Sequence, residues 1–356
     1  MGRRLASGLL AALALLVVAY TVFWYVAVQR IETGIAAWCA ARRAEGWTVA
    51  AGAPRAGGWP FAARALLDGV RLDGGAPDLP VEISWEATQV ALQVPLLHPR
   101  VLEIVSFGAQ RLAVRGGTAL VYTARRLRAR LRLDVTGPPW PVDVTADALS
   151  ARLAARGAPA TIDHMDLHAD FTPKASAASA SLSVVLAASM IELPRGEPDR
   201  AEGATGVRWP LGHEITVLAG DGAISGPAPQ LADPAAEARA WRDGGGTVTV
   251  RHAHLHWGPL DGEAEAALSL DGALQPAASG AARVRGYARA LDVMAAQRVI
   301  DDHAALAAKA VLSLVAVTPP AGGEPEVGLP FTLRDRILSV QHIPLIRLPV
   351  VVWPGP

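Results

Sequence analysis

Five histidines have spacings that suit a metal ion. His252, His254 and His256 alternate along one predicted strand, and His164 and His168 lie on another. Side chains at positions i and i+2 of a strand share a face, so two imidazoles can reach one zinc ion if a neighbouring strand supplies a third ligand. The alternative is that both strands turn these histidines outward to solvent. The sequence favours the solvated faces, and no metal or other cofactor is expected.

Four arginines alternate in the same way. Arg126, Arg128, Arg130 and Arg132 occupy one face of the predicted strand 126–135, and leucines occupy most of the other. Guanidinium groups match phosphate oxygens in geometry, so this row is a candidate site for a lipid headgroup. The alternative is an ordinary exposed sheet face whose charge is offset by acidic residues on neighbouring strands.

Common catalytic patterns are missing from the sequence. It has no glycine-rich phosphate loop of the usual kinds, no Gly-x-Ser-x-Gly elbow and no zinc-binding cysteine pair. Its single cysteine, Cys39, excludes an internal disulfide. The formal net charge is zero and the hydrophobic content is 51%, which disfavours both nucleic-acid binding through bulk charge and disorder. These features predict a folded protein that is not an enzyme and has no nucleic-acid partner.

An uncharged run near the N-terminus predicts a membrane anchor. The segment 9–28 has about 20 residues, enough to cross the hydrocarbon core of a bilayer as one helix. Arg3 and Arg4 precede it, which predicts a cytoplasmic tail over 1–8 and a periplasmic body, with a single pass through the bacterial inner membrane. A cleavable signal peptide is the alternative, but the exit from the run lacks the small-x-small site that such a peptide needs.

The helix is expected to continue beyond the membrane as a stalk over 29–46. Ile31, Ile35 and Trp38 form one apolar stripe, and Gly46 can take the left-handed conformation that ends a helix. The remaining residues, 47–356, are predicted to form one β-rich body. The loop 193–210, rich in proline and glycine, could divide this body in two.

Polar and apolar residues alternate with a period of two through most of the body, which predicts strands. In the clearest strand Leu127, Leu131 and Leu133 point to an apolar interior. Without long crossover helices the sheet should be long, curved and mainly antiparallel. Other predicted strands cover 142–153, 162–171, 181–191, 214–219, 247–257 and 263–270, and hairpin turns are expected at the Asp-Gly pairs 68–69, 73–74, 221–222, 261–262 and 271–272.

A few helices should cover this mainly β fold. Asp233 and Pro234 are typical of the cap and first residue of a helix, which the glycines 244–246 then end. The segment 290–317 has helical apolar spacing, with a break expected near Asp301 and Asp302.

Several motifs resemble a known bacterial family. They are the apolar span followed by Arg42-Arg43-Ala44-Glu45-Gly46-Trp47, then Gly57-Gly58-Trp59-Pro60-Phe61, Val94-Pro95-Leu96-Leu97-His98-Pro99-Arg100 and Leu329-Pro330-Phe331-Thr332-Leu333-Arg334-Asp335. On these motifs the chain resembles the domain-of-unknown-function family 2125 (DUF2125) of alphaproteobacteria. The resemblance implies a membrane-anchored envelope protein with a β-rich body and no established catalytic residues. The layout is also similar to the lipid-handling proteins of the AsmA kind, an analogy of fold alone.

Two classes of function fit these expectations. In the first, the apolar face of the sheet stays partly open and binds or transfers envelope lipid. In the second, the sheet closes on its own core and the protein is a structural or adaptor component that binds other envelope proteins. The few helical residues available to cover a long sheet favour the first. A metal-binding protein that uses the strand histidines is the third hypothesis.

Overall fold

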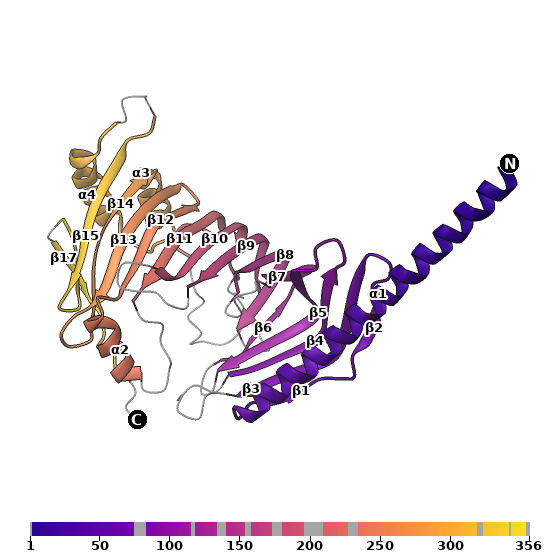
Figure 1. Cartoon of the computed structure of the whole chain (residues 1–356). Helices are drawn as coiled ribbons and strands as arrows, with labels where there is room; N and C mark the ends of the chain where they lie inside the picture. Colours follow the sequence, from indigo (N-terminus) through magenta and orange to yellow (C-terminus); the bar gives the residue numbers. More distant parts are fainter. Residues whose placement is uncertain are drawn as a thin grey trace.

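The computed structural model describes residues 2–74, 83–114, 118–133, 140–153, 158–172, 180–195, 209–226, 234–318, 323–341 and 343–353. Within these residues lie one long N-terminal helix, three short helices and a single sheet of 17 strands, and all of the strand pairings are antiparallel. Figure 1 shows the sheet curving from the indigo N-terminal helix to the yellow C-terminal strands. The expected fold class is confirmed.

The elements have the following bounds. The helices are α1 (Gly2–Ala44), α2 (Pro234–Asp243), α3 (Tyr287–Ala296) and α4 (Asp302–Val315). The strands are β1 (Thr48–Ala50), β2 (Arg55–Gly57), β3 (Ala62–Gly74), β4 (Ile83–Pro95), β5 (Val101–Val114), β6 (Leu120–Thr123), β7 (Arg126–Arg132), β8 (Val142–Leu153), β9 (Ala160–Phe171), β10 (Ala180–Glu192), β11 (Glu214–Ser225), β12 (Thr247–Trp257), β13 (Leu260–Leu270), β14 (Pro276–Arg285), β15 (Glu326–Arg334), β16 (Ile337–Val340) and β17 (Ile343–Arg347).

The sheet is a meander in which strands that follow one another in the chain pair with one another. β3 pairs with β4 and β4 with β5, and each strand from β8 to β16 pairs with the next. Two pairs of short strands interrupt this order. β6 and β7 both lie between β5 and β8, and β1 and β2 share the outer edge of β3. Because β10 pairs with β11, the sheet continues across the loop 193–210.

One face of the sheet is apolar across twelve strands. Residues directly opposite one another in an antiparallel pair lie on the same face, so the register defines a row of side chains. We call this row the apolar row: Ala65, Leu92, Ile104, Ala129, Val144, Leu167, Leu186, Gly220, Ala253, Ala264, Ala282 and Leu329. The face that carries it is the apolar face. Leu127 and Leu131 lie on it, as the alternation predicts, and are half-buried.

The opposite, polar face carries charged and amide side chains from the same strands. The residues adjacent in sequence to those of the apolar row form a second row of directly paired residues on this face. We call it the polar row: Arg64, Gln93, Glu103, Arg130, Asp143, His168, Val185, Asp221 and His252. Val185 is its single apolar member. A slip of one residue in any strand would exchange the two faces, so the alternation fixes the register.

The second half of α1 packs on the apolar face at its β3 end. Val28 is 1% exposed and packs with Ala63 and Leu96. Ile35 packs against the core cluster formed by Leu67, Val70, Ala87 and Val90. Trp38, expected on the buried stripe, is exposed, and Cys39 is buried instead, because the contact with the sheet follows residues 28, 31, 35 and 39 at helical spacing.

Gly46 ends α1 as its sequence predicts. Its φ is +89°, and its N–H donates to the carbonyl of Arg43 at 3.0 Å. The N–H of Trp47 donates to the carbonyl of Arg42 at 3.0 Å, which completes a Schellman motif. Only glycine takes this left-handed conformation at low cost.

The shorter helices lie where the sequence predicts them, although α3 begins at Tyr287, three residues before the predicted start, and α4 ends at Val315, two residues before the predicted end. α2 begins at Pro234 and ends before the glycines 244–246, while its predicted cap Asp233 lies outside the described residues. The break expected in 290–317 is confirmed, because Asp301 caps α4 by accepting a hydrogen bond from the N–H of Ala304 at 2.7 Å. Asp134 and Val135, expected to extend β7, also lie outside the described residues.

Most of the predicted Asp-Gly hairpin turns are wrong. Of the five pairs, only 271–272 lies in the turn between two paired strands. The pairs 68–69, 221–222 and 261–262 lie inside β3, β11 and β13, and 73–74 ends β3. Gly69 has a φ of +60° and no partner between the paired residues Asp68 and Val70, so this pair marks an irregularity within a strand.

The contact between α1 and the sheet can be tested on two adjacent leucines. Leu67 is buried under α1, whereas Leu66 points to the polar face and is half-buried. Leu67→Ala should reduce the free energy of unfolding by about 2–5 kcal/mol through lost burial and a cavity. Leu66→Ala should cost clearly less. The thermal midpoint of the full chain in detergent is the measurement, and equal losses for the two variants would contradict the assignment of faces.

Candidate functional site

The polar face gathers the residues whose types could do chemistry. Arg130, His168 and His252 all belong to the polar row, although 122 positions of sequence separate the first from the last. The strands β7, β9 and β12 that carry them are separated by one strand and by two strands, respectively. The structure therefore aligns these residues without bringing all of them into contact.

The arginine row is largely occupied by internal ion pairs. Arg130 Nε lies 2.8 Å and Arg128 Nη1 lies 3.7 Å from the Glu103 carboxylate, whose side chain is 9% exposed. Arg126 Nη1 lies 3.6 Å from Asp147. Arg132, which is exposed at the end of β7, forms no ion pair with a described residue. Of the four predicted headgroup residues, Arg132 is thus the one whose charge the described sheet leaves unpaired.

Glu103 is the shared partner of two of these arginines on the polar face. Its other carboxylate oxygen accepts a hydrogen bond from Gln93 at 2.7 Å, and Gln93 in turn accepts one from Arg64 at 3.0 Å. Burial by itself raises the pKa of Glu103, but the hydrogen bonds from Gln93 and Arg130, together with the charges of Arg128 and Arg130, outweigh it, so the pKa lies below its usual value. The carboxylate stays ionised and holds both neighbouring guanidinium groups on β7.

His164 is held between two carboxylates. Its Nδ1 lies 2.9 Å from Asp147, and its Nε2 lies 2.8 Å from Asp166. The hydrogen bond to Asp147, followed by that to Asp166, raises the pKa of His164.

His168 repeats this arrangement further along β9. Its Nδ1 lies 2.5 Å from Asp143, and its Nε2 lies 2.8 Å from Asp170. These two hydrogen bonds, that to Asp143 first, raise the pKa of His168. A ring whose nitrogens both donate to carboxylates has no lone pair for a metal ion. Both ring nitrogens of each β9 histidine therefore donate hydrogen bonds to aspartates and are not free to bind a metal ion.

The β12 histidines lie apart from those on β9. Two strands separate β9 and β12, which at about 4.8 Å per strand spacing puts them roughly 14 Å apart. His254 and His256 both face Asp261, at 3.5 and 3.2 Å. The ring centroids of His252 and His254 are 6.4 Å apart. Among the described residues no group of three or more His, Cys, Asp or Glu side chains is arranged to hold a metal ion.

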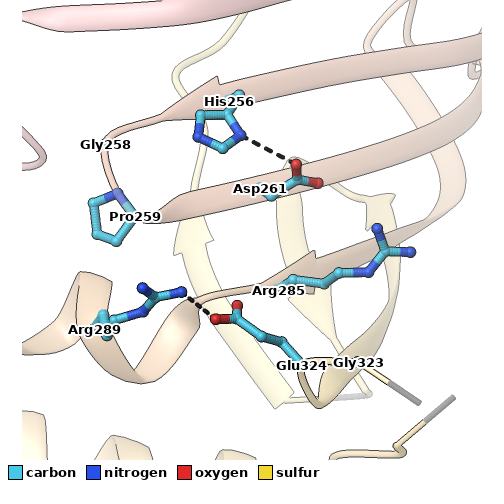
Figure 2. A pocket seen from close by; sticks show the side chains of 8 residues that line it. All are labelled: His256, Gly258, Pro259, Asp261, Arg285, Arg289, Gly323 and Glu324. Carbon is cyan, nitrogen blue, oxygen red and sulfur yellow. Dashed lines mark hydrogen bonds and ion pairs between the residues drawn. The ribbon is translucent and has the colours of Figure 1, made fainter.

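A polar pocket of about 610 Å³ lies at one end of the sheet, and the sequence did not predict it. Figure 2 shows it between the β12–β13 hairpin, the end of β14 and the first turn of α3. Its polar side chains have partners: His256 contacts Asp261, Arg289 contacts Glu324, and Arg285 contacts Glu326 at 3.1 Å. The lining comes from three distant segments, 256–261, 285–289 and 323–324, so no local motif could reveal it.

The apolar face is the larger candidate site. α1 contacts β1 and β3 at one end, and α3 and α4 contact β13 and β15 at the other. Figure 1 shows these helices at the two ends of the sheet. Between them Val144, Leu167, Leu186 and Leu255 are only half-buried, and Leu218 is exposed. These strands therefore present an apolar surface that the described helices leave partly uncovered.

The family is settled by comparison with known proteins. Residues 24–349 match the family described as "Uncharacterized protein conserved in bacteria (DUF2125)". The chain belongs to the DUF2125 family. The match includes the end of α1, the whole described sheet through β17 and all of the candidate residues above. No curated protein and no solved structure matches the chain.

The paired histidines of this DUF2125 member predict a pH dependence. A folded-state pKa above the unfolded value stabilises the fold fully below the unfolded pKa of about 6.5, and this contribution is lost as pH rises through the folded pKa. Both His164 and His168 have raised pKa values. The double variant His164→Gln/His168→Gln should therefore lose more stability at about pH 6 than at about pH 8, by thermal midpoint. His303→Gln, an exposed site on α4, is the control, and an equal loss at both pH values would contradict the assignment.

Proposed function

We propose that this protein is anchored in the bacterial inner membrane and that its body binds the acyl portion of an envelope lipid on the apolar face. One observation carries the proposal: the membrane-spanning candidate α1 lies on the same apolar face that the directly paired residues of the apolar row follow from β3 to β15. A lipid that leaves the bilayer beside α1 would meet this surface first. Burial of its chains on aliphatic side chains is favoured by about 25 cal/mol per Å².

The size of the apolar face fits more than one acyl chain. Twelve strands at about 4.8 Å spacing extend roughly 50 Å across the sheet. A bilayer core of about 30 Å holds the chains of two leaflets, so one chain occupies about 15 Å of depth. The face is thus several times longer than a single lipid requires, which favours a path along the sheet over a closed pocket.

The headgroup would lie at the ends of the strands. The arginine row is on the polar face, opposite the acyl surface, and Arg126, Arg128 and Arg130 are already paired. Arg132 is the last residue of β7, and a side chain at the end of a strand lies close to both faces of the sheet. We therefore assign the leading headgroup role to Arg132 among the four arginines.

Adjacent residues on β10 provide a matched test of lipid binding. Leu186 lies on the apolar face, and Val185 lies on the polar face and is exposed. A photo-crosslinking amino acid at position 186 in living cells should capture phospholipid, and the same group at position 185 should capture much less. Mass spectrometry of the crosslinked protein identifies the adduct. Equal capture at both positions, or none at 186, would contradict the proposal and favour a structural or adaptor role.

The orientation can be tested by a fusion. Arg3 and Arg4 precede the apolar run, which by the positive-inside rule places the N-terminus in the cytoplasm and the body in the periplasm. Alkaline phosphatase fused after Pro356 should therefore be active, because it folds only outside the cytoplasm. An inactive but stable fusion would overturn the orientation. A mature N-terminus near residue 30 would instead show that the span is cleaved.

A further inference from the structure

The β-rich body contacts α1 at residues that lie before Val28, the predicted end of the membrane span. The hydroxyl of Tyr20 donates a hydrogen bond to the carbonyl of Pro60, and Trp24 Nε1 donates to the carbonyl of Ala62 at 2.8 Å. Tyr20 and Trp24 also pack against the cluster that contains Val28. If the span ended at Val28, these contacts would place the β2–β3 turn in the hydrocarbon core, about 12 Å below its surface at Tyr20. Irregular backbone exposed to lipid at such depth leaves polar groups unpaired.

The same end of the sheet exposes three large apolar side chains. Trp59 is 53% exposed, Phe61 is 82% exposed and Leu97 is 89% exposed. They form one rim, because the N–H of Leu96 donates to the carbonyl of Phe61 at 3.2 Å and joins the β2–β3 and β4–β5 turns. Two exposed residues that can carry positive charge, His98 and Arg100, follow Leu97.

We propose that this rim, residues 58–61 and 96–100, is inserted into the interfacial layer of the bilayer that α1 spans. Aromatic rings favour the headgroup level, and an arginine beside them can reach lipid phosphates. The sequence allows the required shift of the span, since no charged residue occurs from Leu5 to Val28. A span from Leu5 to Trp24 has about 20 residues and is about 30 Å long, which matches the hydrocarbon core. Tyr20 and Trp24 then lie in the last turn, near the interface.

The insertion has a consequence for the body. It orients the sheet with the β3 end of the apolar face against the membrane surface, and Arg132 lies near the same rim because it pairs with Val101 at the start of β5. The inference rests on α1 spanning a membrane and does not depend on lipid binding by the apolar face.

A depth measurement on the full chain in phospholipid nanodiscs tests the rim. Cys39 is the single cysteine, so Cys39→Ala provides a background in which one engineered cysteine carries an environment-sensitive fluorophore. Leu97→Cys is the test position. Val17→Cys reports the span, and Leu153→Cys, exposed at the far end of β8, reports the body away from the membrane. The quenchers are a phospholipid with a nitroxide near its headgroup and aqueous iodide.

The lipid nitroxide should quench the label at Leu97 at least as strongly as that at Val17, which lies about 10 Å deeper, and iodide should quench the label at Leu153 far more than either. If Val17 is quenched by the nitroxide while Leu97 behaves like Leu153, the rim is not inserted and the proposal is overturned with the anchor intact. If none of the three is quenched by the nitroxide, the anchor itself is absent and the proposal falls with it.

Discussion

Antiparallel pairing between neighbouring strands is the constraint on which the rest of this structure depends. Each strand carries its small and aliphatic side chains mainly on one face. It needs a partner strand along both edges to satisfy its backbone hydrogen bonds. Pairing in register extends the apolar face by one strand at a time, from Ala65 on β3 to Leu329 on β15. Because the pairing is local in sequence, the sheet extends without crossovers, and it is larger than the four helices of the described residues can cover.

The helices act at the ends of this sheet. α1 covers the apolar face at β3 and β4 through Val28 and Ile35, and α3 and α4 contact the opposite end. The short strands β1 and β2 pair with the outer edge of β3, so β3 does not offer a long free edge for aggregation. In the described part of the chain the apolar face of the middle strands remains accessible, and the proposal of lipid binding rests on this surface.

The polar face plays a different part. Glu103 forms ion pairs with Arg128 and Arg130, and Asp147 and Asp143 pair with His164 and His168, so these side chains have partners on the neighbouring strands. Ion pairs at the surface contribute little stability each, but opposite charges that face each other across a strand pair also oppose a shift in register. We interpret the polar face as a structural surface that keeps the apolar face in alignment.

Local sequence patterns are enough to predict the long apolar N-terminal helix, the strands and the two faces of the sheet. These follow from local pattern: an uncharged run of sufficient length, an alternation of period two, Gly46 at the end of a helix and Asp301 at the start of another. Local pattern was less reliable for the Asp-Gly pairs, since an irregularity inside a strand and a hairpin turn both use the flexibility of glycine. Which of these residues come into contact follows from the tertiary structure. In the folded chain β10 and β11 lie between the two groups of histidines, and the arginines pair with Glu103 and Asp147. The pocket forms beside Arg289, and Tyr20 and Trp24 contact the β2–β3 turn. These contacts depend on strand order, on register and on where α1 crosses the sheet. Such long-range relations cannot be predicted from the residues that are adjacent in the sequence.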